Sequence, residues 1–175
     1  RTEVTVSELK LTAEKVVYEL NALADKLEYG EDYFSVMPYT FSELNAKLNS
    51  AYSKGSEKYP FIQSLKSKVK PVMLSEPMTY THISGVYTFF TGEANVNTNY
   101  PDFIIASSAA HEMAHQRGIV TEDEANFVAF LVCIESDDPY IRYAGYMDML
   151  NTFMAELSSS SPELHGKLYW SMPER

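Results

Sequence analysis

The sequence predicts an α+β fold that is mostly helical, with a small antiparallel or mixed sheet beside one central helix. Apolar residues recur at helical spacing over residues 9–27 and again from residue 103 onward. Between these regions, residues 69–97 are rich in Val, Tyr, Thr, Phe and Ile and contain prolines and Gly85, which is typical of short strands. With 175 residues, 45% of them hydrophobic, the chain is long enough to form one domain with its own core.

The N-terminal third is expected to be helical. Its apolar residues fall on one helical face, and Ser, Thr, Gly and Pro mark the helix ends. The first helix is predicted from an N-cap at Ser7 to near Gly30. The second is predicted over Phe41–Ser53, capped by Thr40 or Ser42 and broken at residues 54–56, and a short third one over residues 61–69.

The second half is expected to return to helices after the strands. Pro101 fits the first position of a helix, and Gly118 fits its C-terminal stop. Two further helices are predicted to open at Asp138-Pro139 and at Ser161-Pro162, because proline is favoured at the first helical position. The predicted single domain, residues 1–175, thus has a helical part over 1–60, the sheet and central helices over 70–136, and C-terminal helices over 138–175.

The motif His111-Glu112-Met113-Ala114-His115 gives the clearest functional prediction. Two histidines four residues apart lie on one face of a helix, so both imidazoles can bind one zinc ion at about 2.0–2.1 Å. Glu112 lies beside them, where it can act as general base toward a water on the metal. The motif therefore predicts a zinc-dependent peptidase that acts on a peptide or protein substrate.

A catalytic zinc site needs a third protein ligand, and the next predicted helix offers acidic residues in its first turn. Glu122 and Asn126 share a helical face, so Glu122 can bind the metal while Asn126 orients a histidine. Glu124 fits a capping box with Thr121, and Asp123 suits the positive end of the helix. The residues favour Glu122 as the third ligand and leave Glu124 as the alternative.

The HExxH motif followed by a Glu-x-x-Ala-Asn helix resembles the gluzincin type of metallopeptidase. The run from His111 to Phe130, with residues 92–97 before it and 136–146 after it, resembles the DUF3810 family of bacterial membrane-anchored proteins. The resemblance is close over about residues 70–150, and its most specific parts are the HQRG and EDEAN continuations. It implies a zincin-like fold, ligation by His111 and His115, and Glu112 as the base, and the EDEAN match extends the third ligand to Glu122.

Composition excludes several other classes of function. The net charge of −10 argues against binding to nucleic acid or to an anionic membrane surface. No apolar run of about 18 residues is present to span a bilayer, and no signal peptide is visible. Because the chain begins with Arg1, we expect a piece of a longer protein. The resemblance to the DUF3810 family implies that this protein is attached to the cell membrane through segments outside this chain, with this domain on the extracellular side. The single Cys133 is expected to be a small buried apolar residue.

Two further features bear on substrate binding. The predicted strand Ile83–Thr91 precedes the HExxH helix, where zincins hold the substrate backbone as an added strand, although it fits an ordinary core strand equally well. Candidates for stabilising the oxyanion are Arg142, Tyr143, Tyr146 and His165. Two alternative functions remain: a non-catalytic zinc-fold sensor or binding domain, and a helical interaction domain with a fortuitous motif.

Overall fold

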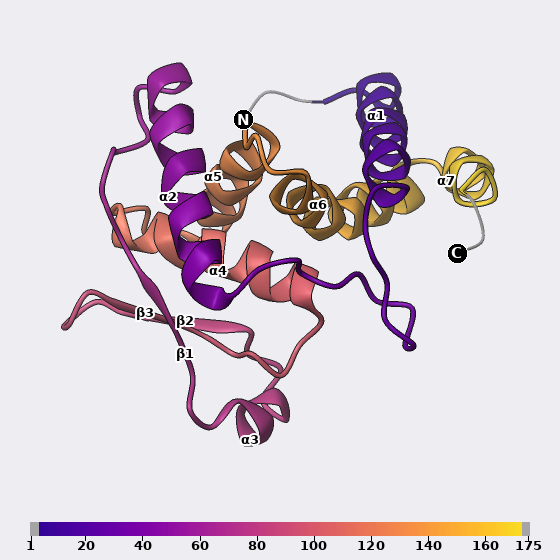
Figure 1. Cartoon of the computed structure of the whole chain (residues 1–175). Helices are drawn as coiled ribbons and strands as arrows, with labels where there is room; N and C mark the ends of the chain where they lie inside the picture. Colours follow the sequence, from indigo (N-terminus) through magenta and orange to yellow (C-terminus); the bar gives the residue numbers. More distant parts are fainter. Residues whose placement is uncertain (1–3, 173–175) are drawn as a thin grey trace.

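The computed structural model describes residues 4–172. Over these residues the chain runs through two helices, a small sheet with a short helix inserted in it, and four more helices (Figure 1). The predicted α+β fold, mostly helical with a small sheet, is confirmed. The elements are α1 (Val6–Ala24), α2 (Phe41–Lys58), β1 (Val69–Pro71), α3 (Ser75–Thr79), β2 (Gly85–Thr88), β3 (Glu93–Val96), α4 (Asp102–Gln116), α5 (Glu122–Ile134), α6 (Pro139–Ser160) and α7 (Pro162–Tyr169).

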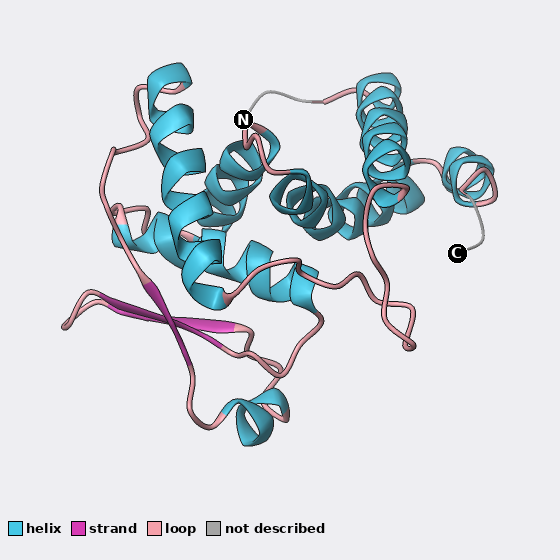
Figure 2. Ribbon diagram, viewed as in Figure 1, coloured by secondary structure: helices cyan, strands magenta, loops and turns pink. Residues whose placement is uncertain are grey.

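The sheet has the strand order β1-β3-β2, with β1 parallel and β2 antiparallel to β3. β2 is therefore an edge strand. Helix α4 packs on this sheet and also contacts α5 and α6, so it lies between the sheet and the other helices (Figure 2). Its side toward the core carries small residues and Met113, which is fully buried. The predicted sheet beside the HExxH helix is thus present, and the short helix α3 between β1 and β2 is an addition that the composition did not indicate.

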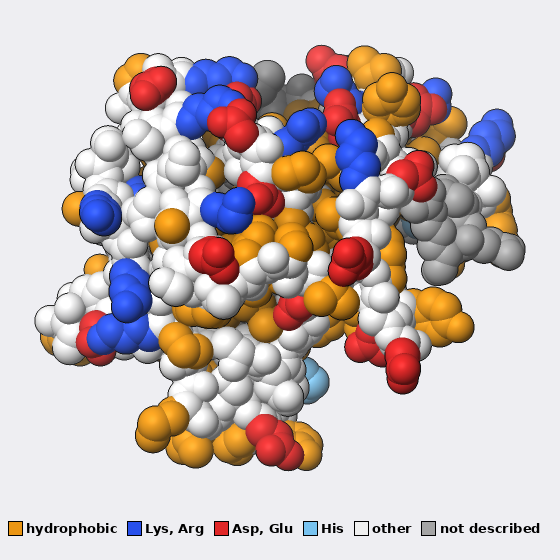
Figure 3. Space-filling view, viewed as in Figure 1, with side chains coloured by type: hydrophobic (Ala, Val, Ile, Leu, Met, Phe, Trp, Pro, Cys, Tyr) orange, Lys and Arg blue, Asp and Glu red, His pale blue; other side chains and the backbone are white. Residues whose placement is uncertain are grey.

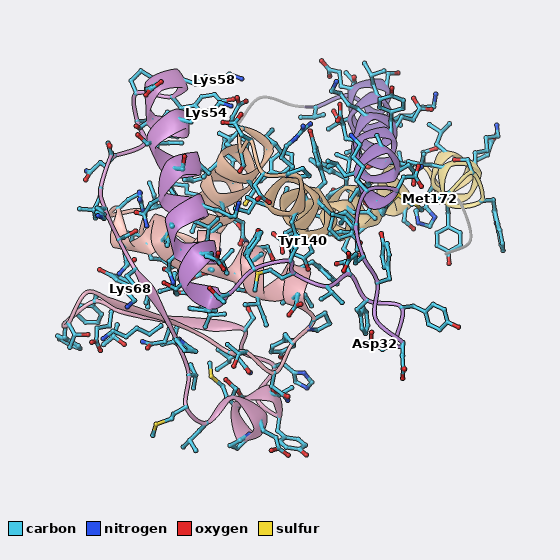
Figure 4. All side chains as sticks on the ribbon, in the orientation of Figure 1. Asp32, Lys54, Lys58, Lys68, Tyr140 and Met172 are labelled. Carbon is cyan, nitrogen blue, oxygen red and sulfur yellow. The ribbon has the colours of Figure 1, made fainter. Side chains whose placement is uncertain are left out.

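Helix α6 is the support for the rest of the C-terminal region and for α1. The interface between α1 and α6 is made of apolar residues from both helices, and α7 packs against the same helix. Two lysines on one side of α2, Lys54 and Lys58, point toward the segment after α5, where they pair with Asp137 and Glu135 at 2.5 Å (Figure 4). On the face of the molecule that Figure 3 shows, positively and negatively charged side chains are interspersed.

The boundaries of α1 differ from those predicted. Its N-cap is Thr5 and not Ser7, because Thr5 and Glu8 form a reciprocal capping box in which each side chain accepts from the other's backbone N–H. The helix ends at Ala24, well before Gly30. There the backbone tightens into i to i+3 hydrogen bonds, and the following segment turns back on itself.

Helix α2 does not break at residues 54–56 as predicted, but continues through Gly55 to Lys58. Gly55 is a point of close packing: a Cβ atom there would lie 3.1 Å from Cγ2 of Val132 on α5. A helical glycine can therefore serve close contact between helices as well as mark a helix end. Thr40 is confirmed as the N-cap, paired with Glu43 in a second capping box.

The predicted short helix over 61–69 is wrong, and Arg117 explains the extended path of this segment. The Arg117 side chain is 3% exposed and donates hydrogen bonds to the carbonyls of Gln63 and Leu65. Its guanidinium also stacks 3.6 Å from the ring centroid of the buried Tyr52. Because these carbonyls accept from Arg117, the segment is tied to the end of α4. In a helix the same carbonyls would accept from N–H groups of that helix instead.

Several boundaries in the second half are confirmed. Pro101 directly precedes α4, and Gly118 adopts a left-handed φ of +86° just after it, as a C-terminal stop requires. Asp138 caps α6 by accepting from the N–H groups of the first turn, and Cys133 is buried at the packing surface of α5. Among the helices of residues 4–172, none combines the length and the apolar character needed to cross a membrane.

Candidate metal centre

Helix α4 places the motif histidines at the wall of a cavity. His111 and His115 are one turn apart, and their Nε2 atoms lie 3.0 Å from each other with the rings nearly perpendicular. His115 is 9% exposed and stacks on Tyr87 of β2, with ring centroids 5.8 Å apart. The sheet thus covers one of the two imidazoles and leaves their Nε2 atoms directed at a common point.

Glu122 completes the group from the first turn of α5. Its Oε2 atom lies 3.0 Å from Nε2 of His111, and its Oε1 atom lies 3.5 Å from Nε2 of His115. The left-handed turn at Gly118 reverses the chain between α4 and α5, which brings Glu122 back onto the histidines despite the short sequence separation. One ligand atom from each of the three residues lies within 4.8 Å of the others.

Glu124, the alternative ligand, does not join this group. Thr121 is the N-cap of α5 by its backbone conformation, but its side chain makes no capping hydrogen bond, so the predicted capping box with Glu124 is absent. Glu124 is exposed on the helix surface and is outside the group of potential ligands found among the described residues.

The donor set fits a zinc ion. Nδ1 of His115 lies 2.7 Å from the carbonyl oxygen of Ile119, which can only accept a hydrogen bond, so the proton is on Nδ1 and the lone pair of Nε2 faces Glu122. Two imidazole nitrogens and a carboxylate then meet at one point. Such a His₂Glu set provides three protein ligands and leaves a fourth position for water or substrate.

Glu112 follows His111 in the sequence and faces the same cavity. It is 5% exposed, and its Oε2 atom is buried without a hydrogen-bond partner. Burial, reinforced by the charge of Glu122, raises the pKa of the Glu112 carboxyl to about 7. Gly85 of β2 packs directly over this carboxylate, because a Cβ atom at that position would lie 2.4 Å from Oε1. A buried carboxyl with one unpartnered oxygen, held beside three potential ligands, is suited to act as a general base.

The cavity has a volume of about 850 Å³ and is bounded by β2, α4, the turn before α5, and α6. Its apolar walls come from two sides, with Val86 and Phe89 on the strand side and Ile119 and Val120 on the turn side. None of the described residues that line it is Lys or Arg. An open cavity of this size can admit a segment of polypeptide to the ligand group.

The four candidates for an oxyanion group lie elsewhere. Tyr143 and Tyr146 are buried in the apolar interface of α1 and α6, and Arg142 pairs with Glu19 at 3.3 Å. His165 stacks on Tyr169 within α7. None of these four residues lines the cavity.

Two residues that the sequence did not single out do line the cavity. Asp148 reaches it from α6, and His82 precedes β2 with a φ of +58°, unusual for a residue other than glycine. Surrounding protein atoms raise the pKa of the Asp148 carboxyl, opposed by the charge of His111 and a hydrogen bond with Ser107. The signal for Asp148 was an acidic residue within the otherwise apolar run Tyr146–Leu150. Asn126 also lines the cavity, without a hydrogen bond to either histidine.

Comparison with known proteins places the chain in a family. No curated protein and no solved structure matches it. The family model described as "Protein of unknown function (DUF3810)" matches residues 1–175, which extends the resemblance beyond the central region to the whole sequence. The chain therefore belongs to the DUF3810 family.

Proposed function

We propose that this protein is a zinc-dependent peptidase. The observation that carries the proposal is the convergence of His111, His115 and Glu122 at one point, with the buried carboxyl of Glu112 beside them. A zinc ion bound there would supply a water of pKa about 7 and polarise the scissile carbonyl. Glu112 would be the general base that accepts a proton from the attacking water and donates it to the leaving amine.

The edge strand β2 supports an extended peptide as the substrate. The carbonyl of Ser84 accepts from the N–H of Asn97 on the β3 side, so by strand alternation Val86 also bonds toward β3. The N–H and C=O groups of Gly85 and Tyr87 consequently point to the open edge. A peptide added there as an antiparallel strand would pass directly over Glu112 and His115.

A comparison of Tyr87→Pro with Tyr87→Ala tests this binding mode. Both variants lose the ring that stacks on His115, but only proline removes the N–H at the open edge. We expect Tyr87→Pro to raise KM by about fivefold over Tyr87→Ala, since one hydrogen bond contributes about 1 kcal/mol. Zinc affinity, measured in parallel, should be equal in the two variants. Equal KM values would show that no substrate strand pairs at this edge. Proline at Val86 or Thr88 would be a poor test, because these residues bond toward β3.

Metal analysis and peptide cleavage together test the proposed function. The protein is purified without an affinity tag, its bound metal is quantified, and it is incubated with an unbiased peptide library. We expect one zinc ion per chain and cleavage that stops on addition of a chelator and returns with zinc. Bound zinc without cleavage of any peptide would favour the non-catalytic sensor or binding domain, and failure to bind metal would favour a helical interaction domain.

Attachment to the membrane through segments outside this chain stays a prediction from the family resemblance.

A further inference from the structure

The two histidines of the metal centre are oriented differently. His115 is fixed from behind by the carbonyl of Ile119, which holds the proton on Nδ1 and leaves Nε2 free to bind a metal. His111 has contacts at Nε2 with His115 and Glu122, but none of the described residues accepts a hydrogen bond from its Nδ1. Metal-binding histidines almost always donate this second N–H to a carboxylate, a carbonyl or a water. His111 therefore lacks the hydrogen bond at Nδ1 that fixes the His115 ring.

Asp148 is the carboxylate placed to accept a hydrogen bond from Nδ1 of His111. Ser107 and His111 are four residues apart on α4, so their side chains lie on the same face, one turn from each other. The Asp148 carboxylate comes from α6 and lines the same cavity as Ser107 and His111, and both of these side chains act to lower its pKa. A carboxylate on the Ser107 side of the cavity lies within about one helical turn of the His111 ring, a span that one water can bridge.

The charge and the solvent contact of Asp148 fit this role. Its side chain stays accessible from the cavity, so it is not needed to fill the core. Asn126, which the sequence favoured as the orienting residue, lies on α5 in the wall of the same cavity and makes no hydrogen bond to either histidine. The two residues thus offer competing assignments that a pair of substitutions can separate.

Building on the proposed zinc site, we propose that Asp148 is a positioning residue that accepts a hydrogen bond from Nδ1–H of His111 through one water. The carboxylate then keeps the proton on Nδ1, directs the lone pair of Nε2 at the metal and makes the imidazole a more basic ligand. The metal site would be built from three helices, with its ligands on α4 and α5 and this supporting residue on α6.

The test is zinc affinity, measured by competition with a chelator, which does not depend on any peptidase activity. Asp148→Ala is expected to weaken zinc binding by about 10- to 100-fold, the usual effect of removing a group that orients a ligand. Asp148→Asn keeps an oxygen acceptor but loses the charge, so its loss should be smaller. The matched control Asn126→Ala, from the same cavity wall, should bind zinc as the unmodified protein does.

A spectroscopic readout separates orientation from a general structural effect. In ¹⁵N NMR spectra of the zinc-bound protein, the Nδ1 proton of His111 should be protected from exchange, and this protection should be lost in Asp148→Ala while that of His115 persists. Unchanged zinc affinity in Asp148→Ala, or a loss confined to Asn126→Ala, would overturn the role of Asp148 and leave the proposed peptidase intact. Failure of the unmodified protein to bind zinc would instead remove the proposed function itself.

Discussion

The Glu112→Gln variant is expected to retain one zinc ion per chain and to hydrolyse peptides about 10²–10⁴-fold more slowly than the unmodified protein, the usual contribution of a general base. Glutamine has almost the same shape but cannot take a proton from water. The three potential ligands are unchanged, because Glu112 points into the cavity beside them and contributes no atom to the group. The measurements are kcat/KM on a cleaved library peptide and zinc content for both proteins.

Stability provides the control for this variant. The Glu112 carboxylate is buried and its Oε2 atom has no partner, so replacing it by a neutral amide removes a buried charge. The melting temperature of Glu112→Gln at neutral pH should therefore be no lower than that of the unmodified protein. Hydrolysis that persists at the normal rate in a folded, zinc-loaded variant would rule out Glu112 as the base.

The Glu112 carboxylate can also be displaced by a substitution at Gly85, which leaves Glu112 itself unchanged. A methyl group at Gly85 would overlap Oε1 and the adjacent carbons of Glu112, so Gly85→Ala should force the side chain away from its present position. Its effect on kcat/KM should follow that of Glu112→Gln in direction, with zinc content retained. If Gly85→Ala were fully active, the position of the carboxylate under β2 would not matter for the reaction.

The parts of this site that could be predicted from the sequence depend on local geometry. Spacing of four residues places His111 and His115 on one helical face whatever the fold, and the structure gives them adjacent Nε2 atoms. The sequence also predicts the end of this helix at Gly118, where the chain turns, and the start of the next helix a few residues later. These two local features bring Glu122 to the histidines. The sequence favoured Glu122 on other grounds, namely the helical face that it shares with Asn126 and the EDEAN match.

The parts that the sequence did not reveal depend on contacts between distant segments. The non-helical path of residues 63–68 follows from hydrogen bonds that Arg117 donates to the carbonyls of Gln63 and Leu65, 54 and 52 positions away in the chain. Gly55 resembles a helix end and is a packing contact with Val132, while Gly85 makes room for Glu112. Asp148 gains its place in the cavity only because α6 packs on α4. Periodicity and capping rules cannot report such pairings, since they describe one segment at a time.

Glu122→Ala is expected to weaken zinc binding by more than about 100-fold, beyond the loss caused by removing a residue that only orients a ligand. Peptide hydrolysis should be lost at zinc concentrations that saturate the unmodified protein. The reason is geometric: Glu122 supplies the carboxylate oxygens nearest to both histidine Nε2 atoms, at 3.0 and 3.5 Å. Two imidazoles alone leave a zinc ion short of the three protein ligands that catalytic sites provide.

Glu124→Ala is the matched control, because it removes the same charge from the same first turn of α5. Each substitution loses a favourable interaction with the helix dipole of about 0.3–1 kcal/mol, so the two melting temperatures should fall by similar small amounts. Because the Glu122 side chain is 75% exposed, its removal should not disrupt the fold, and misfolding would not explain a loss of metal. Zinc affinity lost in Glu124→Ala and kept in Glu122→Ala would transfer the third ligand to Glu124 and require α5 to rotate by about half a helical turn when the metal binds.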